Sequence, residues 1–178
     1  MTKGLSGDGA VAECILGVDP GIGTTGWAVI TANSVGWRLV EYGCIRPRRD
    51  GAVGERLYDI FRGIADLCRR FGPAEAALEG SFYGKNVKAA LTIGQARAAV
   101  LLAAVEAGVP VFEYPARVVK QAVTGRGQAA KSQVGYMVQN ILGLRDALTP
   151  EDAADAAAIA LCHLLRRSIV APLRAGAR

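Results

Sequence analysis

The hydrophobic and polar positions at the beginning of the chain follow the pattern of short strands. An apolar run, CILGVD, occupies residues 14–19 and is followed by GWAVIT at 26–31 and GWRLVEYGCI at 36–45. The second and third runs are aromatic and β-branched, and no helix start signal precedes them. The pattern therefore predicts three consecutive strands, with a glycine-rich turn between the first two.

The pattern then changes to a helical period in residues 54–72. Apolar residues recur there three and four positions apart on one stripe, namely Leu57, Ile60, Phe61, Ile64 and Leu67. Gly72 and Pro73 follow directly and are typical of a helix end. We therefore expect an amphipathic helix after the three strands.

Strand and helix patterns alternate through the rest of the chain. Strands are predicted at 75–80 and 109–114, and helices at 87–108, 115–123, 129–144 and 149–168. Three strands followed by alternating helices and strands indicate an α/β fold, in which a mixed central sheet is flanked by helices. Its first three strands are expected to be antiparallel and the later strands parallel. We expect one domain at 14–167, a loose tail at 1–13 and a basic tail at 168–178.

The glycine turn contains Gly21-x-Gly23-x-x-Gly26, which matches the spacing of a dinucleotide-binding fingerprint. That fingerprint requires a helix after the glycines, because the pyrophosphate rests on the helix N-terminus. A strand follows here, and the Asp19 carboxylate would face any bound phosphate unless a metal lay between them. Asp19 is therefore a candidate metal ligand, although Asp19-Pro20-Gly21 is also a favourable turn sequence.

Composition restricts the class of protein and of site. Hydrophobic residues make up 51% of the 178 residues but occur in short runs, so we expect a soluble, cytoplasmic protein with no membrane span. Four separated cysteines and one histidine, His163, argue against a zinc site or disulfide framework, and we expect buried, reduced thiols.

The net charge is +5, and sixteen of the 21 basic residues are arginine, which suits a polyanionic partner. The RPRR run at 46–49 fits phosphate contact or an ordinary solvated turn.

Acidic residues stand where predicted elements begin and end. Asp19 ends the first strand, Glu79 ends the fourth, and Asp152 and Asp155 share one face of the last helix. The helical pair has an alternative explanation, because Thr149-Pro150-Glu151-Asp152 resembles a capped helix start, although this leaves Asp155 unexplained. Converging carboxylates repel one another unless a divalent ion compensates them, and oxygen ligands suit Mg²⁺ or Mn²⁺. A basic chain with such a site suggests a nuclease that uses up to two ions.

Four sequence blocks stand out along the chain: GVDPGIGTTGWAVI, ALEGSFYGKNVKAALTIGQARA, VPVFEYPARVVKQAVTGRGQAAKSQV and DAADAAAIALCH. In this order they resemble the motifs of the bacterial RuvC Holliday junction resolvases, and the likeness spans about residues 14–165. The resemblance implies an RNase H-like fold and a homodimer. It also implies Mg²⁺-dependent nicking of two opposed strands of a four-way DNA junction, with 5′-phosphate ends, and work beside the RuvA and RuvB branch-migration proteins.

The resemblance also assigns residues. Asp19, Glu79, Asp152 and Asp155 match the four catalytic, metal-binding carboxylates of the family, and Lys120 and Lys131 match its two functional lysines. Phe82 matches an aromatic that stacks on junction bases, and packing under the next helix is its alternative role. Further DNA contacts are expected from the neighbouring loop and from the two helices that follow the fourth and fifth strands, at Tyr83, Lys85, Lys88 and Arg117.

Other functions and placements compete with parts of this interpretation. The DPGIGTTGWAV block also resembles the phosphate motif of actin-like and sugar-kinase ATPases, but those need a second domain that 178 residues cannot supply. An RNase H-like nuclease for structured RNA, or a module that binds junctions without cutting, also fits the motifs. A dimer face is expected on residues 88–107, through Ile93, Val100 and Leu101. His163 is expected near a helix C-terminus, outside the acidic site.

Overall fold

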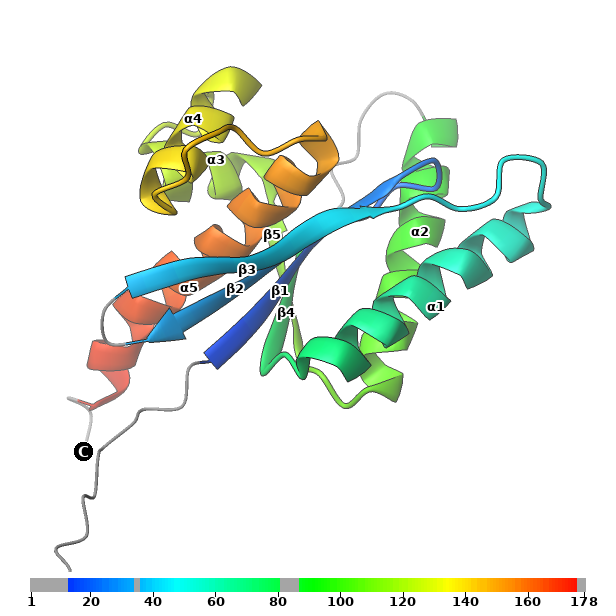
Figure 1. Ribbon diagram of the computed structural model, residues 1–178, viewed down its shortest axis with the longest axis horizontal. Helices are drawn as coiled ribbons and strands as arrows, with labels where there is room; N and C mark the ends of the chain where they lie inside the picture. Colours follow the sequence, from blue (N-terminus) through cyan, green and yellow to red (C-terminus); the bar gives the residue numbers. More distant parts are fainter. Residues whose placement is uncertain (1–12, 34–35, 81–86, 176–178) are drawn as a thin grey trace, which may run out of the picture.

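The computed structural model describes residues 13–33, 36–80 and 87–175. Its elements follow the order β1–β2–β3–α1–β4–α2–β5–α3–α4–α5 (Figure 1). The strands are β1 Glu13–Asp19, β2 Thr25–Asn33, β3 Gly36–Ile45, β4 Glu75–Gly80 and β5 Val111–Pro115. The helices are α1 Val53–Phe71, α2 Val87–Glu106, α3 Ala116–Thr124, α4 Lys131–Ile141 and α5 Glu151–Ala175.

One mixed sheet forms the centre of the domain, with the strand order β3-β2-β1-β4-β5. β1 pairs antiparallel with β2, β2 pairs antiparallel with β3, and β4 lies parallel to both β1 and β5. The prediction of three antiparallel strands followed by parallel strands is therefore confirmed. β1 is central, and the carboxyl ends of β1 and β4 lie side by side because the two strands run in the same direction.

Helices cover both faces of the sheet (Figure 1). α1 and α2 pack on one face against Leu16, Val18 and Leu78. α5 packs on the other face against Ile15 and Ala77, and α3 and α4 complete that layer. Because side chains alternate along a strand, β1 supplies buried residues to both layers, which explains its continuous apolar run.

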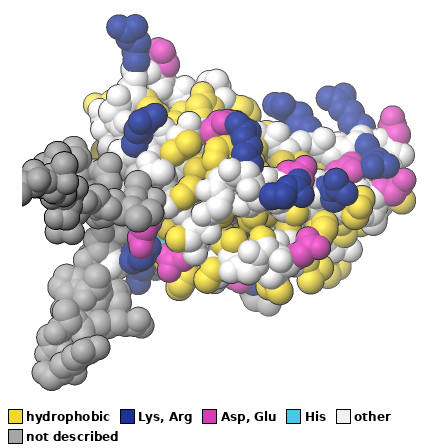
Figure 2. Space-filling model, turned by 60° about the horizontal axis from the view of Figure 1, so that its bottom comes forward, with side chains coloured by type: hydrophobic (Ala, Val, Ile, Leu, Met, Phe, Trp, Pro, Cys, Tyr) yellow, Lys and Arg dark blue, Asp and Glu magenta, His cyan; other side chains and the backbone are white. Residues whose placement is uncertain are grey.

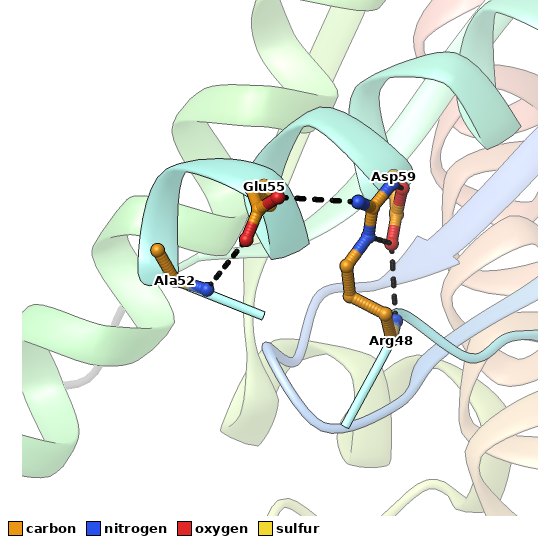
Figure 3. Close-up of polar contacts among 4 residues, drawn as sticks. All are labelled: Arg48, Ala52, Glu55 and Asp59. Carbon is orange, nitrogen blue, oxygen red and sulfur yellow. Dashed lines mark hydrogen bonds and ion pairs between the residues drawn. The ribbon is translucent and has the colours of Figure 1, made fainter. Parts of the chain in front are cut away.

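The loop before α1 is fastened to that helix by Arg48, one residue of the RPRR run (Figure 3). Its Nη2 atom lies 2.8 Å from Oδ1 of Asp59, and its Nη1 atom lies 3.3 Å from Oε1 of Glu55. Glu55 also accepts a hydrogen bond from the Ala52 backbone N–H, at 2.8 Å. The Arg48 guanidinium thus orders a loop and the first turn of a helix, so its charge is already compensated within the chain.

The helix that carries two of the acidic residues differs from its prediction at both ends. α5 begins at Glu151, and the Pro150 carbonyl accepts hydrogen bonds from the N–H groups of Ala153 and Ala154. Pro150, rather than Thr149, therefore occupies the N-cap position, so the capped helix start that was the alternative explanation does not use Thr149 as its cap. The helix continues to Ala175, beyond residue 167, where the folded domain was expected to end.

Helix α2 is more apolar than the sequence interpretation allowed. In the described part of the chain, residues Ala89–Glu106 are long and apolar enough to cross a membrane by length and composition alone, with a mean hydropathy of 1.4. Length and composition alone therefore do not distinguish this helix from a membrane span. One side of the helix, including Ala96, Val100 and Ala103, is buried against α1 and the sheet, and a helix in a protein core passes the same test.

Candidate active site

Two acidic side chains meet at one edge of the sheet. Asp19 is the last residue of β1, and Glu79 is the residue after Leu78, which pairs with Val18 across the parallel β1–β4 ladder. Neighbouring residues of parallel strands lie about 5 Å apart, so the two carboxylates leave adjacent strands at the same level. The convergence expected from the two strand ends is present in the structure.

The first two turns of α5 bring two more carboxylates to this edge, those of Asp152 and Asp155, because glycines on the sheet let the helix approach closely. A Cβ atom on Gly26, which pairs with Asp19, would lie only 1.9 Å from the Asp152 carbonyl oxygen. A Cβ atom on Gly17 would lie 2.1 Å from the carbonyl oxygen of Ala156. Gly26 of the G-x-G-x-x-G pattern therefore serves helix packing beside the acidic residues rather than contact with a pyrophosphate.

The electrostatics show that the four carboxylates lie close enough to affect one another. Burial raises the pKa of Asp19 from 3.8 to about 7, and the charges of Glu79, Asp155 and Asp152 contribute to this rise, whereas Lys131 lowers the pKa. Burial also raises the pKa of Glu79, followed by the charge of Asp155. Among the described residues, no three acidic, cysteine or histidine side chains already lie close enough to hold one metal ion. The four carboxylates therefore concentrate negative charge at this edge of the sheet.

Basic residues on α3 and α4 border this acidic cluster. Nζ of Lys131, the first residue of α4, lies 2.9 Å from Oδ2 of Asp155, and this pairing raises the pKa of Lys131. Lys120 on α3 lies near enough to Glu79 to lower the pKa of that carboxyl group. Arg117 is exposed at the start of α3. Its side chain lies against Gly127, since a Cβ atom added to Gly127 would be 2.7 Å from Cγ of Arg117. Both predicted functional lysines therefore lie beside predicted catalytic acids.

Two side chains that the sequence did not single out hold the glycine turn beside Asp19. Thr25 is fully buried, and its hydroxyl donates a hydrogen bond to the Gly21 carbonyl at 2.9 Å. Nη2 of Arg56, on α1, donates to the Ile22 carbonyl at 2.8 Å. The threonine could have been suspected as a small polar residue opening a strand after a turn, whereas nothing in the pattern of α1 distinguishes Arg56 from its other arginines.

Cys44 also lies near the acidic cluster. It pairs with Gly26, which in turn pairs with Asp19, so the three residues form one row across β3, β2 and β1. Burial, followed by the charge of Asp152, raises the pKa of its thiol. All four cysteines are free thiols, as expected, but only Cys68 and Cys162 are buried, so the expectation of four buried thiols was wrong for Cys14 and Cys44.

The residues expected to touch DNA from the loop after β4 lie outside the described part of the chain. Phe82, Tyr83 and Lys85 belong to residues 81–86, and the side chain of Lys88 is not described either, although its backbone belongs to α2. Their assignments remain predictions.

His163 does not stand near the end of a helix, as the sequence suggested. It lies in the middle of α5 and is 2% exposed. Its Nδ1 atom lies 2.8 Å from the Tyr114 hydroxyl, and its Nε2 atom lies 2.7 Å from a carboxylate oxygen of Glu75, which also pairs with Arg167. A carboxylate accepts hydrogen bonds, so Nε2 donates to Glu75. The prediction was wrong because α5 continues beyond 168, and the histidine instead links α5 to β4 and β5.

Comparison with known proteins identifies close relatives. The family described as Crossover junction endodeoxyribonuclease RuvC matches residues 15–163. A Crossover junction endodeoxyribonuclease RuvC from Pelotomaculum thermopropionicum is 45% identical over 149 residues, which cover 84% of this chain and 91% of that protein. Another from Halorhodospira halophila is 48% identical over 161 residues, covering 90% of this chain and 94% of that protein.

Solved structures agree with the sequence comparison. Thermus thermophilus RuvC, in complex with a Holliday junction substrate, has 37% sequence identity and a TM-score of 0.83, covering 88% of this chain and 96% of that one. The yeast mitochondrial Holliday junction resolvase Ydc2 shares the fold at 13% identity, with a TM-score of 0.64. The likeness to RuvC structures confirms the expected RNase H-like fold.

Proposed function

The chain belongs to the RuvC family of crossover junction endodeoxyribonucleases, and we propose that its acidic cluster resolves four-way DNA junctions by paired phosphodiester hydrolysis. The observation that carries this assignment to particular residues is the meeting of Asp19, Glu79, Asp152 and Asp155 at one edge of the sheet, beside Lys120 and Lys131. Each cut leaves a 5′-phosphate. The same residues are proposed as the catalytic set.

The chemistry of the four carboxylates fits divalent cations. Their partial burial and mutual repulsion raise the pKa of Asp19 to about 7, so the charge of Lys131 only partly compensates these carboxylates. All-oxygen ligand sets favour Mg²⁺, with Mn²⁺ as a substitute, and four carboxylates could hold up to two ions. When bound, such ions activate a water molecule and stabilise charge on the attacked phosphate.

The protein's own residues hold the acids in place and supply cations beside them. The rigid ends of β1 and β4 hold Asp19 and Glu79, and the close packing of α5 holds Asp152 and Asp155 against them. Lys131, which pairs with Asp155, and Lys120, which lies beside Glu79, can offer cations to phosphate oxygens of the scissile strand.

A homodimer is part of this proposal, because a junction presents two equivalent strands to be cut. The predicted face on α2 needs correction, since Val100 is fully buried and Leu101 packs partly against the same core. Large apolar side chains do point outward elsewhere on α2, at Val87, Leu91, Ile93, Leu102 and Val105. Most of these form one stripe, and Gly94 and Ala98 lie in its middle, so a second copy of α2 could approach closely there.

Replacing one exposed residue of this stripe tests the dimer. Leu102→Glu places a charge in the apolar stripe and should convert the protein to a monomer that no longer makes paired cuts. Val53→Glu, an exposed apolar position on α1, serves as the matched control and should remain dimeric. Analytical ultracentrifugation of both variants, with circular dichroism to confirm folding, provides the measurement. A dimeric Leu102→Glu variant would contradict this face.

The cellular setting is proposed from the family as a whole. We expect the protein to act in the bacterial cytoplasm, on junctions that the RuvA and RuvB branch-migration proteins move.

A substrate panel tests the proposed function directly. Labelled four-way junction, linear duplex and structured RNA are incubated with the protein and Mg²⁺, and the products are separated on denaturing gels. Symmetric nicks in the junction alone are the expected result. Cleavage of the RNA in preference to the junction would replace the proposal with an RNA-processing activity, and binding without cleavage would indicate a junction-binding module.

A further inference from the structure

Two hollows adjoin on the surface of α4. One of about 370 Å³ lies between α4 and the start of α5, and its lining includes Lys131 and Asp155 of the acidic site. The other, of about 460 Å³, lies toward the loop between α3 and α4, and its lining includes Thr124 and Arg126. Ser132 and Tyr136 line both hollows. A path therefore leads from the acidic site, past Tyr136, to Arg126.

The segment that carries α3 and α4 is rich in basic residues, whereas Glu151 and Asp155 line the end of the path at the acidic site. Residues 116–145 contain five basic side chains and no acidic one: Arg117, Lys120, Arg126, Lys131 and Arg145. Within the described parts of the chain, the Arg126 guanidinium takes part in no ion pair, and Lys131 pairs only with Asp155. The positive potential of this segment is therefore available to a polyanion.

The opposite helical layer differs in this respect. Arg48, Arg69 and Arg70 are paired with acidic side chains, and Figure 2 shows basic and acidic groups mixed over the face turned toward the viewer. Such paired charges contribute little attraction to a polyanion. Charge complementarity thus selects the α3–α4 side.

Tyr136 gives the path a surface on which a flat ring can stack. Its side chain is 64% exposed, and among the described residues no other aromatic ring packs on it. The other side chains of the two hollows combine hydroxyl and amide groups, at Thr124, Ser132, Gln133 and Gln139, with apolar ones such as Met137 and Leu148, so the lining offers hydrogen bonds to a polar backbone and apolar contacts to a flat ring. An exposed aromatic ring between cations is how proteins hold single nucleic-acid strands.

We propose that the two hollows hold one strand of the four-way junction next to the scissile phosphate. A base of that strand stacks on Tyr136, and its backbone phosphates contact Arg126 and Lys131. This inference rests on the proposed function, because it assigns a path to the strand that the acidic site cuts. It makes Tyr136 a residue that positions the substrate, and Arg126 a residue that binds a phosphate.

The test compares three tyrosine variants of the full chain. Tyr136→Ala removes the ring, Tyr136→Phe keeps it, and Tyr58→Ala removes a ring from a similarly exposed position on α1. Junction affinity is measured in Ca²⁺, and single-turnover cleavage in Mg²⁺. Removing the stacking surface of one base should weaken binding by about fivefold or more for Tyr136→Ala. Tyr58→Ala should bind and cut as the parent does, and Tyr136→Phe should recover most of the affinity that Tyr136→Ala loses, because it keeps the ring.

A fluorescent base then locates the stacking position. 2-Aminopurine is placed at successive positions of the cleaved strand, and its quenching by the parent and by Tyr136→Ala is compared. Quenching that depends on Tyr136 and is confined to positions close to the cut supports the path. Arg126→Gln should also make binding less sensitive to salt, lowering the slope of log affinity against log salt by about 0.9, because the variant neutralises one phosphate fewer.

The outcomes separate this inference from the proposed function. If the parent cuts junctions and Tyr136→Ala binds as tightly as Tyr58→Ala, with unchanged quenching, the strand does not use these hollows and the nuclease function stands. If the parent neither binds nor cuts junctions, the proposed function fails, and the strand path fails with it.

Discussion

The buried charge of Asp19 should make the metal-free protein less stable at high pH, and Asp19→Asn should remove this effect. The pKa of Asp19 is raised from 3.8 to about 7, chiefly by burial and then by Glu79, Asp155 and Asp152. A carboxyl group whose pKa is higher in the folded state binds a proton more tightly there than in the unfolded chain. Its ionisation therefore opposes folding: stability falls as pH rises from about 4 to about 7, and stays low above that.

The size of the effect follows from the same pKa values. At about 1.36 kcal/mol for each tenfold change in proton affinity, the difference between 3.8 and about 7 corresponds to about 4 kcal/mol once the group is fully ionised in both states. Near pH 5 the carboxyl group is already ionised in the unfolded chain but still protonated in the folded protein, and this costs about 1.6 kcal/mol of stability. The stability advantage of Asp19→Asn over the parent should therefore grow by about 2 to 3 kcal/mol between about pH 5 and about pH 8.

Urea denaturation in EDTA at several pH values measures this difference. Asp59→Asn is the matched control, since Arg48 lowers the pKa of Asp59 to about 2 through a hydrogen bond. Its stabilising contribution is present above about pH 4 and is lost as pH falls below that, so its effect should be constant from about pH 5 to about pH 8 and opposite in sign. An Asp19→Asn variant that gains no stability at the higher pH would refute the proposed burial of unbalanced charge.

Three further outcomes follow from the site. Gly26→Ala should destabilise the fold by about 1–3 kcal/mol and reduce cleavage, because its Cβ would lie 1.9 Å from the Asp152 carbonyl oxygen. Gly23→Ala is the control, because a Cβ at Gly23 meets nothing within 4 Å, and equal melting temperatures of the two variants would contradict the packing argument. Lys131→Gln should lower the single-turnover cleavage rate by about 100-fold with a smaller effect on binding, and an unchanged rate would assign the lysine to ion pairing alone. Junction affinity should fall steeply with salt, by a slope of about 0.9 for each phosphate contacted, and a flat response would exclude electrostatic docking.

The sheet and the acidic site could be predicted because each depends on local patterns. Apolar runs located the five strands, and helical spacing located α1 and α2. Asp19 and Glu79 stand at the ends of two predicted strands, and their convergence follows because those strands are parallel neighbours in the structure. The position of Asp155 beside them depends on the close packing of α5, which Gly17 and Gly26 on the sheet permit.

The features that the sequence did not predict depend on contacts between distant segments. Burial of His163 against Tyr114 and Glu75 requires knowledge of where α5 crosses β4 and β5. The outward face of α2 could not be separated from its buried face, because alanine and leucine occur on both sides, and Val100 was assigned to the wrong one. Likewise, Cys44 reaches the acidic site through a cross-strand row that exists only after β3 has paired with β2.

The central claim is that the four acidic residues form one catalytic site, and amide substitution tests it most directly. Asp19→Asn, Glu79→Gln, Asp152→Asn and Asp155→Asn each remove one negative charge while nearly preserving side-chain size. The measurement is nicking of a labelled four-way junction in Mg²⁺ by each variant, beside junction binding in Ca²⁺. We predict that all four variants bind the junction and that none cuts it at the parental rate. Full cleavage by Asp19→Asn or Glu79→Gln would contradict the mechanism.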